Sequence, residues 1–310
     1  MSMPHDSGTE RRELLREIET LAASSPGLLE VWLFGSRANG VHHAASDWDL
    51  LVYARPEAFD ILVKRKDLQP KDADLLVVRS SGLCQSPWST NSASGTTEKR
   101  LSIRELEWQR KNSDQAKYTG RTPYCDKAGN RIANHYDLVP HVAHRVWKNR
   151  PCRAHSYLFD TNIFNRIIKG TKNYRITPGA KCLATSWQEM EIRKTNNPER
   201  RGFLLDHLRA ITAAYPVDEV ACQTTCWGAK WGSAWDRGGC FYNEILAHLC
   251  ELQQAADKVE SHRVDAAIIE TCIFEGLIFV SDDQKARIAA SVFDVPSIPF
   301  EQAPLVEVRS

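Results

Sequence analysis

The sequence lacks the long apolar run that a membrane-spanning helix requires. Its most apolar stretch, residues 266–280, is interrupted by Glu270 and Glu275, whereas a bilayer span needs about 20 consecutive apolar residues. The first residues, MSMPHDSGTERRELLREIE, are polar and charged and contain no apolar signal core. These two absences predict a cytoplasmic protein with no membrane partner.

The chain also lacks an excess of charge of either sign. It contains 40 Lys and Arg residues and 39 Asp and Glu residues, which gives a formal net charge of +1. Any binding to a nucleic acid would therefore depend on local basic patches. The basic stretches 64–66, 110–111 and 145–153 are candidates, and solvated surface is the alternative for each of them.

The nine cysteines are an odd number and are scattered along the chain, which argues against a disulfide framework. Several lie in or near the segment 221–240, where free thiols are favoured and a zinc site is the alternative. The same segment has three tryptophans at intervals of four, which suits packing, with base stacking on RNA as the alternative. These residues are Cys222, Cys226, Cys240, Cys250, Trp227, Trp231 and Trp235.

A length of 310 residues is about twice that of a single core, so we expect two domains. Apolar periodicity predicts a helix over 10–23, then strands over 29–34, 48–54 and 73–78, with a helix before the last strand. This order indicates an α/β domain with a mixed sheet over residues 1–125. Residues 80–100 fit a loop, residues 101–118 fit either a helix or an extended strand pair, and we interpret 126–154 as a basic linker.

Residues 155–310 alternate regularly between expected strands and helices. Strands are predicted at 156–160, 181–186 and 277–283, with helices over 161–170, 187–194, 198–215, 243–262 and 264–276. Such alternation implies parallel strands joined by helical crossovers. The fold class is therefore α/β, with a second domain built on a parallel sheet with flanking helices.

A short polar motif follows the first strand. Gly35 and Ser36 form a turn, and ten residues later Asp47 and Asp49 open the next strand. Glycine lets backbone N–H groups approach a triphosphate closely. Two aspartates at i and i+2 on a strand project from one face, where both carboxylates can share Mg²⁺ or Mn²⁺ ions. Arg37 would be placed to contact phosphate, with a solvated helix position as the alternative.

A third carboxylate is needed to complete this site and to help deprotonate an acceptor hydroxyl. Asp74 is our choice and Asp72 is the alternative. The whole pattern resembles the minimal nucleotidyltransferases of the DNA polymerase beta superfamily over about residues 10–80. The resemblance implies an NTP substrate, held at Gly35, Ser36 and Arg37. It also allows a non-catalytic copy, because small members of this superfamily serve as antitoxin-like partners.

Four acids are spread through the second domain at positions that can converge at one edge of a parallel sheet. Asp160 ends the first strand, Glu191 lies on a helix, Asp265 begins another helix, and Asp283 follows the last strand. Such a cluster repels itself unless cations neutralise it, so Mg²⁺ or Mn²⁺ is expected. Two such ions can activate water and stabilise the leaving oxygen of a phosphodiester.

The segments LFDTNIFNRI, QEMEIRKTNNPERR and DAAIIET...LIFVSDD resemble PIN-domain nucleases, including toxin components of toxin-antitoxin pairs. This resemblance covers about residues 155–300. It implies that the four acids bind metal, that Asn162 supports the first of them, and that an antitoxin or a second copy of the chain is a partner. Glu189 remains the alternative to Glu191, and Asp282 the alternative to Asp283.

The two motifs together predict a metal-dependent endoribonuclease fused to a nucleotidyltransferase that moves a nucleotide from an NTP to RNA or protein. DNA is the alternative to RNA as the substrate that is cut. A second hypothesis is a toxin-antitoxin-like fusion in which the first domain binds NTP and regulates the nuclease without turnover. A third is a nucleotidyltransferase carrying an inert PIN-like scaffold.

Overall fold

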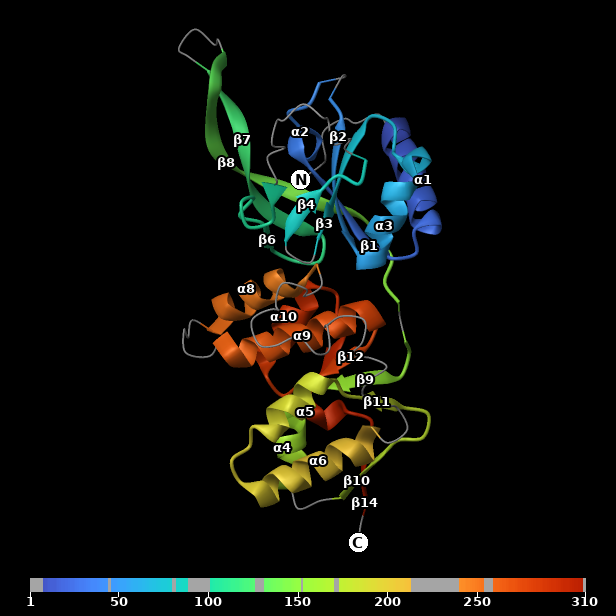
Figure 1. Ribbon diagram of the computed structural model, residues 1–310, viewed down its shortest axis with the longest axis vertical. Coiled ribbons are helices and arrows are strands. Elements are labelled where there is room, and N and C mark those ends of the chain that lie inside the picture. The colour runs from blue at the N-terminus through green and yellow to red at the C-terminus, as the bar shows by residue number, and fades with distance from the viewer. Residues whose placement is uncertain are drawn as a thin grey trace. The chain divides into compact units, whose positions relative to one another are not determined.

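Figure 1 shows the computed structural model of the chain, which divides into two compact units, Met1–Asn149 and Arg150–Ser310. The structure describes residues 8–43, 46–79, 82–88, 101–125, 131–151, 153–169, 173–212, 240–253 and 259–308. The cysteines and tryptophans of the segment 221–240, apart from Cys240, lie outside these ranges. Within the described ranges, no helix combines the length and apolarity that crossing a membrane requires.

The first unit is built on one mixed sheet with the strand order β5-β4-β3-β2-β1-β8-β7-β6. Strand β1 pairs antiparallel with both β2 and β8, whereas β2 and β3 run parallel. The helices are α1 (Gly8–Ser24), α2 (Gly35–Ala38) and α3 (Pro56–Lys64). The strands are β1 (Leu28–Phe34), β2 (Trp48–Ala54), β3 (Ala73–Val78), β4 (Leu83–Gln85), β5 (Leu101–Ser102), β6 (Gln109–Arg110), β7 (Gln115–Cys125) and β8 (Arg131–Lys148).

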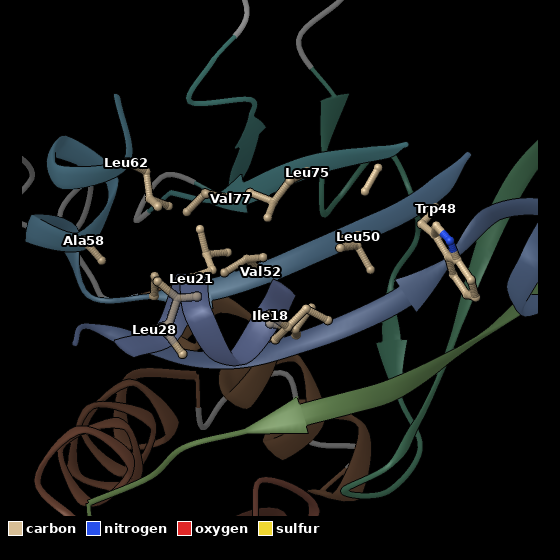
Figure 2. Packing of buried hydrophobic residues seen from close by; sticks show 14 of the residues in the cluster. Ile18, Leu21, Leu28, Trp48, Leu50, Val52, Ala58, Leu62, Leu75 and Val77 are labelled. Atoms are coloured by element: carbon tan, nitrogen blue, oxygen red, sulfur yellow. The ribbon is translucent and has the colours of Figure 1, made fainter. Parts of the chain in front are cut away.

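One face of this sheet packs against α1 and α3. Alternate residues of the strands, such as Leu50 and Val52 of β2, point to this face and meet Ile18 and Leu21 of α1, as Figure 2 shows. Leu62 of α3 belongs to the same cluster. The predicted helix over 10–23 and the three predicted strands are confirmed, and they build this core. Asp49, which alternates with Leu50 along β2, therefore lies on the opposite face of the sheet.

The prediction of a basic linker over 126–154 is wrong for residues 131–148. These residues form β8, which pairs with β1 inside the sheet and with β7 in a long two-stranded ribbon (Figure 1). The sequence does not reveal this strand, because the residues 131–148 show no regular alternation of apolar and polar residues. Of the two alternatives for residues 101–118, extended strands are correct, because this fully described segment contains β5, β6 and the start of β7 and no helix.

Two of the basic stretches contribute buried arginines to the face opposite the core. Arg110 donates to Glu30 Oε2 at 2.8 Å, and Arg145 lies 3.2 Å from Glu30 Oε1. Trp32 Nε1 donates to the same carboxylate at 3.0 Å. Burying a carboxylate is costly unless it is paired and hydrogen-bonded, and Glu30 is fully buried. Arg110 and Arg145 therefore neutralise Glu30 and do not form a basic surface patch.

The second unit contains a four-stranded parallel sheet with the order β11-β9-β12-β13, and a separate antiparallel pair of β10 with β14. The strands are β9 (Ser156–Phe159), β10 (Asn173–Ile176), β11 (Lys181–Leu183), β12 (Ile278–Val280), β13 (Ser297–Ile298) and β14 (Leu305–Val308). The helices are α4 (Thr161–Lys169), α5 (Ser186–Arg193), α6 (Pro198–Thr212), α8 (Tyr242–Gln253), α9 (Val259–Glu275) and α10 (Gln284–Val292).

The predicted parallel sheet with helical crossovers is confirmed. Its three predicted strands are present, and Phe159, Phe164 and Val280 belong to a core that also includes residues of α5 and α6. The pairing of β10 with β14 was not predicted. It joins two short segments more than 120 residues apart, and neither shows a long alternation of apolar and polar residues.

Candidate functional site

The turn at the end of β1 requires a glycine at position 35. Gly35 has φ +73°, a conformation that side chains with a Cβ rarely adopt. A Cβ built there would lie 1.7 Å from Oδ2 of Asp49 and 2.6 Å from its Cγ. The backbone of the turn therefore lies directly against the Asp49 carboxylate.

Three carboxylates meet beside this turn. Asp49 of β2 is paired in register with Asp74 of the parallel strand β3, and Asp47 precedes Asp49 by two residues. Side chains of paired residues in adjacent strands share a face, so the Asp49 and Asp74 carboxylates are neighbours. Burial, and then the charges of Asp47 and Asp74, raise the pKa of Asp49 to about 6, while a hydrogen bond from the Ser36 backbone N–H opposes the shift.

The alternative third carboxylate, Asp72, is placed differently. It lies in the turn before β3 with φ +55°, and its backbone carbonyl accepts a hydrogen bond from Trp48 N at 2.9 Å. Its charge is not among those that shift the pKa of Asp49, whereas the charge of Asp74 is. The geometry therefore favours Asp74 over Asp72 as the partner of Asp49.

Arg37 occupies a different environment from the one expected. Its side chain is buried, and its guanidinium lies 4.2 Å from the centre of the Trp48 ring. Nε donates to the carbonyl of Ser46 at 2.8 Å, and Nη1 lies 3.2 Å from Glu10 Oε2. The guanidinium is therefore held by Ser46, Glu10 and Trp48, and the contact of Arg37 with phosphate stays a prediction.

The backbone amides of the turn are also engaged inside the protein. The N–H of Gly35 donates to the hydroxyl of Tyr118 at 2.8 Å, and the N–H of Ser36 donates to the Asp49 carboxylate. Asn39 donates to the carbonyl of Gly35 at 2.7 Å. A ligand bound at this turn would therefore compete with, or add to, bonds that already exist.

Sequence reasoning missed Tyr118 and His141, which β7 and β8 bring to the same face. Tyr118 is paired with His141, and their ring centres are 5.4 Å apart. The ring of Tyr118 also packs edge-on against Phe34, at 5.8 Å. No local motif marks these residues, because Tyr118 lies 83 positions from Gly35 and reaches it only through pairing of β8 with β1.

The raised pKa of Asp49 makes the stability of the ligand-free protein depend on pH. An ordinary Asp titrates near pH 4, so between about pH 4 and 6 the folded state keeps a proton that the unfolded chain releases. Stability therefore falls as the pH rises through this window. The rise of the Asp49 pKa from about 4 to about 6 corresponds to about 3 kcal/mol, which we discount to about 1–2 kcal/mol because solvent screens the partly exposed side chain.

We accordingly expect Asp49→Asn to raise the free energy of unfolding by about 1–2 kcal/mol at pH 7.5 and to leave it nearly unchanged at about pH 4. Urea unfolding at the two pH values measures this difference. Asp72→Asn, at an exposed position on the same edge, is the control and gives no such contrast. An equal effect of Asp49→Asn at both pH values would contradict the electrostatic explanation.

A second acidic site lies at the ends of β9 and β12 in the other unit. The carboxylate of Asp160 accepts hydrogen bonds from Asn162 Nδ2 at 2.7 Å and from Ser281 Oγ at 2.6 Å. The expected contact of Asn162 with Asp160 is therefore present. Ser281 is an additional partner that the sequence did not reveal, since a serine after a strand is common.

The four predicted acids of this unit are close enough to interact. Burial, and then the charges of Asp160, Glu191 and Asp283, raise the pKa of Asp265 well above its ordinary value. Burial also raises the pKa of Asp160, and the charge of Glu191 adds to that effect. Residues from α5, α9 and the ends of two strands therefore converge at one place.

The alternatives Glu189 and Asp282 are engaged in ion pairs. Glu189 pairs with Arg193 one turn further along α5, and Asp282 pairs with Arg166 of α4. Neither contributes to the pKa shift of Asp265. The geometry therefore favours Glu191 over Glu189 in the cluster. It also favours Asp283 over Asp282, although Asp283 accepts hydrogen bonds at the N-terminus of α10 as well.

The carboxylates of neither cluster are arranged around a common centre as the ligands of a bound metal ion are. Among the described residues, no group of three or more His, Cys, Asp or Glu side chains is arranged to hold a metal ion. The charges of neighbouring carboxylates nevertheless help to raise the pKa of Asp49 in the first cluster and of Asp265 in the second. Like charges spread apart without a cation between them, and carboxylate oxygens are the donors that Mg²⁺ and Mn²⁺ prefer. The donor chemistry of both clusters therefore fits a hard divalent cation.

Comparison with known proteins bears on the first unit. No curated protein and no solved structure matches the chain. Residues 11–91 match the family model described as a nucleotidyltransferase domain. The matched range contains the Gly35–Ser36 turn and the three carboxylates, and it ends before β7 begins. The first unit therefore carries a nucleotidyltransferase domain.

Proposed function

We propose that the chain transfers a nucleotide from an NTP to a hydroxyl group of RNA or protein. The acceptor oxygen forms a bond to the α-phosphorus while the bond from that phosphorus to the β-phosphate oxygen breaks, which releases pyrophosphate. The observation that carries the proposal is the Asp49 carboxyl, which packs against the Gly35 turn and has a pKa raised partly by Asp47 and Asp74. The family match over residues 11–91 supports it.

The three carboxylates and the glycine turn have different roles in the proposed transfer. Asp47, Asp49 and Asp74 would hold Mg²⁺ or Mn²⁺, which supplies positive charge to the triphosphate and lowers the pKa of a bound acceptor hydroxyl. Asp74 is exposed and lies beside Asp49, so it is placed to accept the proton of that hydroxyl. The absence of a Cβ at Gly35 lets the Asp49 carboxylate lie directly against the turn proposed to bind the triphosphate.

Labelled NTPs test the proposal directly. The full chain, incubated with each α-labelled NTP, Mg²⁺ or Mn²⁺, and candidate RNA and protein acceptors, should give a labelled product. The variant Asp47→Asn with Asp49→Asn should give none, and the variant Asp72→Asn should label as wild type. Labelling by the double variant at the wild-type level would contradict the assignment of Asp47 and Asp49 to nucleotide transfer.

A second proposed activity is metal-dependent cleavage of RNA by the second unit, with DNA as the alternative substrate. The observation that favours it is the burial of Asp265 among the charges of Asp160, Glu191 and Asp283. These four acids would hold Mg²⁺ or Mn²⁺, which activates water for attack on a phosphodiester. The sequence resemblance to PIN-domain nucleases and the parallel sheet that carries Asp160 support this proposal.

Asp160→Asn should reduce this cleavage by about 10³-fold or more, because the buried carboxylate is replaced by a neutral group in a site that depends on charge. Gel analysis of labelled RNA in Mg²⁺ or Mn²⁺ measures the rate. Asp206→Asn, which changes an exposed carboxylate of α6, is the matched control. Cleavage that survives Asp160→Asn at the wild-type rate would exclude Asp160 from the reaction.

The regulatory alternative has a different signature. If the first unit binds NTP without turnover and controls the nuclease, NTP should alter the rate of RNA cleavage while no labelled product forms. An antitoxin-like role of the first unit, or an antitoxin or second copy of the chain as partner, belongs to this alternative. Cleavage assays with and without NTP on the same full chain separate it from nucleotide transfer.

A further inference from the structure

Tyr118 of β7 contacts the Gly35–Ser36 turn, although it lies outside the residues that match the family model. Its hydroxyl oxygen accepts the backbone N–H of Gly35 at 2.8 Å and the side-chain amide of Asn39 at 3.2 Å. Gly35 is the residue whose other side faces the carboxylate of Asp49. The Tyr118 hydroxyl and the Asp49 carboxylate therefore flank the same glycine.

The direction of both hydrogen bonds to Tyr118 is fixed by their partners. A backbone N–H can only donate. The amide of Asn39 is oriented by two further contacts, because its Oδ1 accepts from Val142 N at 3.0 Å and its Nδ2 donates to the carbonyl of Gly35 at 2.7 Å. Nδ2 is therefore the atom that meets the Tyr118 hydroxyl, and it donates there too.

In both bonds the phenol oxygen of Tyr118 is the acceptor, so its own O–H hydrogen is used in neither. A hydroxyl has two lone pairs and one hydrogen to donate. Both lone pairs of Tyr118 are taken, and no hydrogen bond seen among the described residues uses its O–H as the donor. Tyr118 is only 5% exposed, and a buried donor without an acceptor is costly. The O–H of Tyr118 is therefore available to donate a hydrogen bond to a ligand.

The surroundings of Tyr118 keep this hydrogen in place. The ring is packed between Trp108, with ring centres 6.0 Å apart, and His141, at 5.4 Å, so it has little freedom to turn away. Burial and the nearby charge of Asp49 raise the pKa of the Tyr118 phenol above its ordinary value. The hydroxyl is therefore protonated at neutral pH and rigidly directed.

We propose that the Tyr118 hydroxyl donates its hydrogen to a phosphate oxygen of an NTP bound at the Gly35–Ser36 turn. This inference rests on the proposed function of the first unit. It makes the ribbon of β7 and β8 part of the nucleotide site, beyond the residues that the family match covers. Because the contact is to phosphate, its contribution does not depend on which base the NTP carries.

Calorimetric titration of the full chain with Mg²⁺ and each of ATP, GTP, CTP and UTP tests the inference. Tyr118→Phe removes the hydroxyl and keeps the ring, so the affinity should fall about tenfold for every NTP that wild type binds, as expected for one hydrogen bond to a charged group. Asn39→Ala is the matched control, since it loosens the same turn but leaves the hydroxyl present.

The two variants separate a direct contact from mere support of the turn. A direct contact predicts that Tyr118→Phe loses more NTP affinity than Asn39→Ala, although Asn39→Ala lowers the melting temperature more because it loses three hydrogen bonds. The inference is overturned if Tyr118→Phe binds NTP within about twofold of wild type, or if Asn39→Ala loses as much affinity. A wild-type chain that binds no NTP refutes the proposed function itself.

Discussion

Replacing Asp74 by Asn should reduce nucleotide transfer by about 10²- to 10³-fold, which is the usual contribution of a general base or a charged ligand. Asp74 is paired with Asp49 across two parallel strands, and its charge raises the pKa of Asp49. The substitution keeps the size of the side chain and removes only its charge. The rate of label transfer from an NTP, measured at saturating Mg²⁺, gives the effect.

Asp72→Asn is the matched control for this experiment. Asp72 has φ +55°, a conformation that Asn tolerates well, so the backbone of the turn should be preserved. Its carbonyl can still accept the hydrogen bond from Trp48 N. We expect the transfer rate to stay within about twofold of wild type, in line with the small effects of most surface substitutions. The opposite ranking of the two variants would assign the third carboxylate to Asp72.

Gly35→Ala should nearly abolish transfer. The added Cβ would lie 1.7 Å from Oδ2 of Asp49, so the carboxylate or the turn must move. A displacement of about 1 Å at a reacting centre costs about 10²-fold in rate. The positive φ of Gly35 adds a backbone cost of about 1–2 kcal/mol. We therefore expect both a lower melting temperature and a loss of activity of about 10²-fold or more.

Gly179→Ala separates the two causes. Gly179 has φ +85°, and a Cβ there would meet no atom within 4 Å. The substitution should thus lower stability by about 1–2 kcal/mol through the backbone alone and leave transfer unchanged. Thermal unfolding and label transfer are measured on both variants. Wild-type transfer by Gly35→Ala would show that the contact between the turn and Asp49 is not needed for the reaction.

The part of the first site that the sequence predicted depends on local rules. The rule of alternation along a strand predicts Asp47 and Asp49 on the same face, although β2 begins only at Trp48, and the glycine before Ser36 marks the turn. The choice between Asp74 and Asp72 needed the register of β2 against β3, which the sequence does not specify. The burial of Arg37 could not be predicted, because only the packing reveals Trp48 and Glu10 around its guanidinium.

The strands that complete the first unit could not be predicted for a physical reason. β8 joins the sheet beside β1, more than 100 residues away in sequence, and its side chains alternate poorly because Arg145 is buried against Glu30. Any pattern of apolar and polar residues predicts that a charged residue lies at the surface, even where it is buried. Tyr118 was missed as a consequence, since only the pairing of β7 and β8 brings it to Gly35.

The second unit followed its sequence pattern more closely. The strand ends that carry Asp160 and Asp283 lie at neighbouring strands of a parallel sheet, as the order of strands and helices predicts. The pairs Glu189 with Arg193 and Asp282 with Arg166 were not visible in the sequence. The charges of Glu191 and Asp283, and not those of the paired acids, raise the pKa of Asp265.

The most direct test of the account is a crystal structure of the full chain with Mn²⁺ and a non-hydrolysable NTP. We predict Mn²⁺ bound by Asp47, Asp49 and Asp74, with the triphosphate at the Gly35–Ser36 turn. Anomalous scattering identifies the ion without ambiguity. An NTP bound elsewhere, or a triphosphate at the turn with no ion on Asp49, would contradict the assignment of this site to nucleotide transfer.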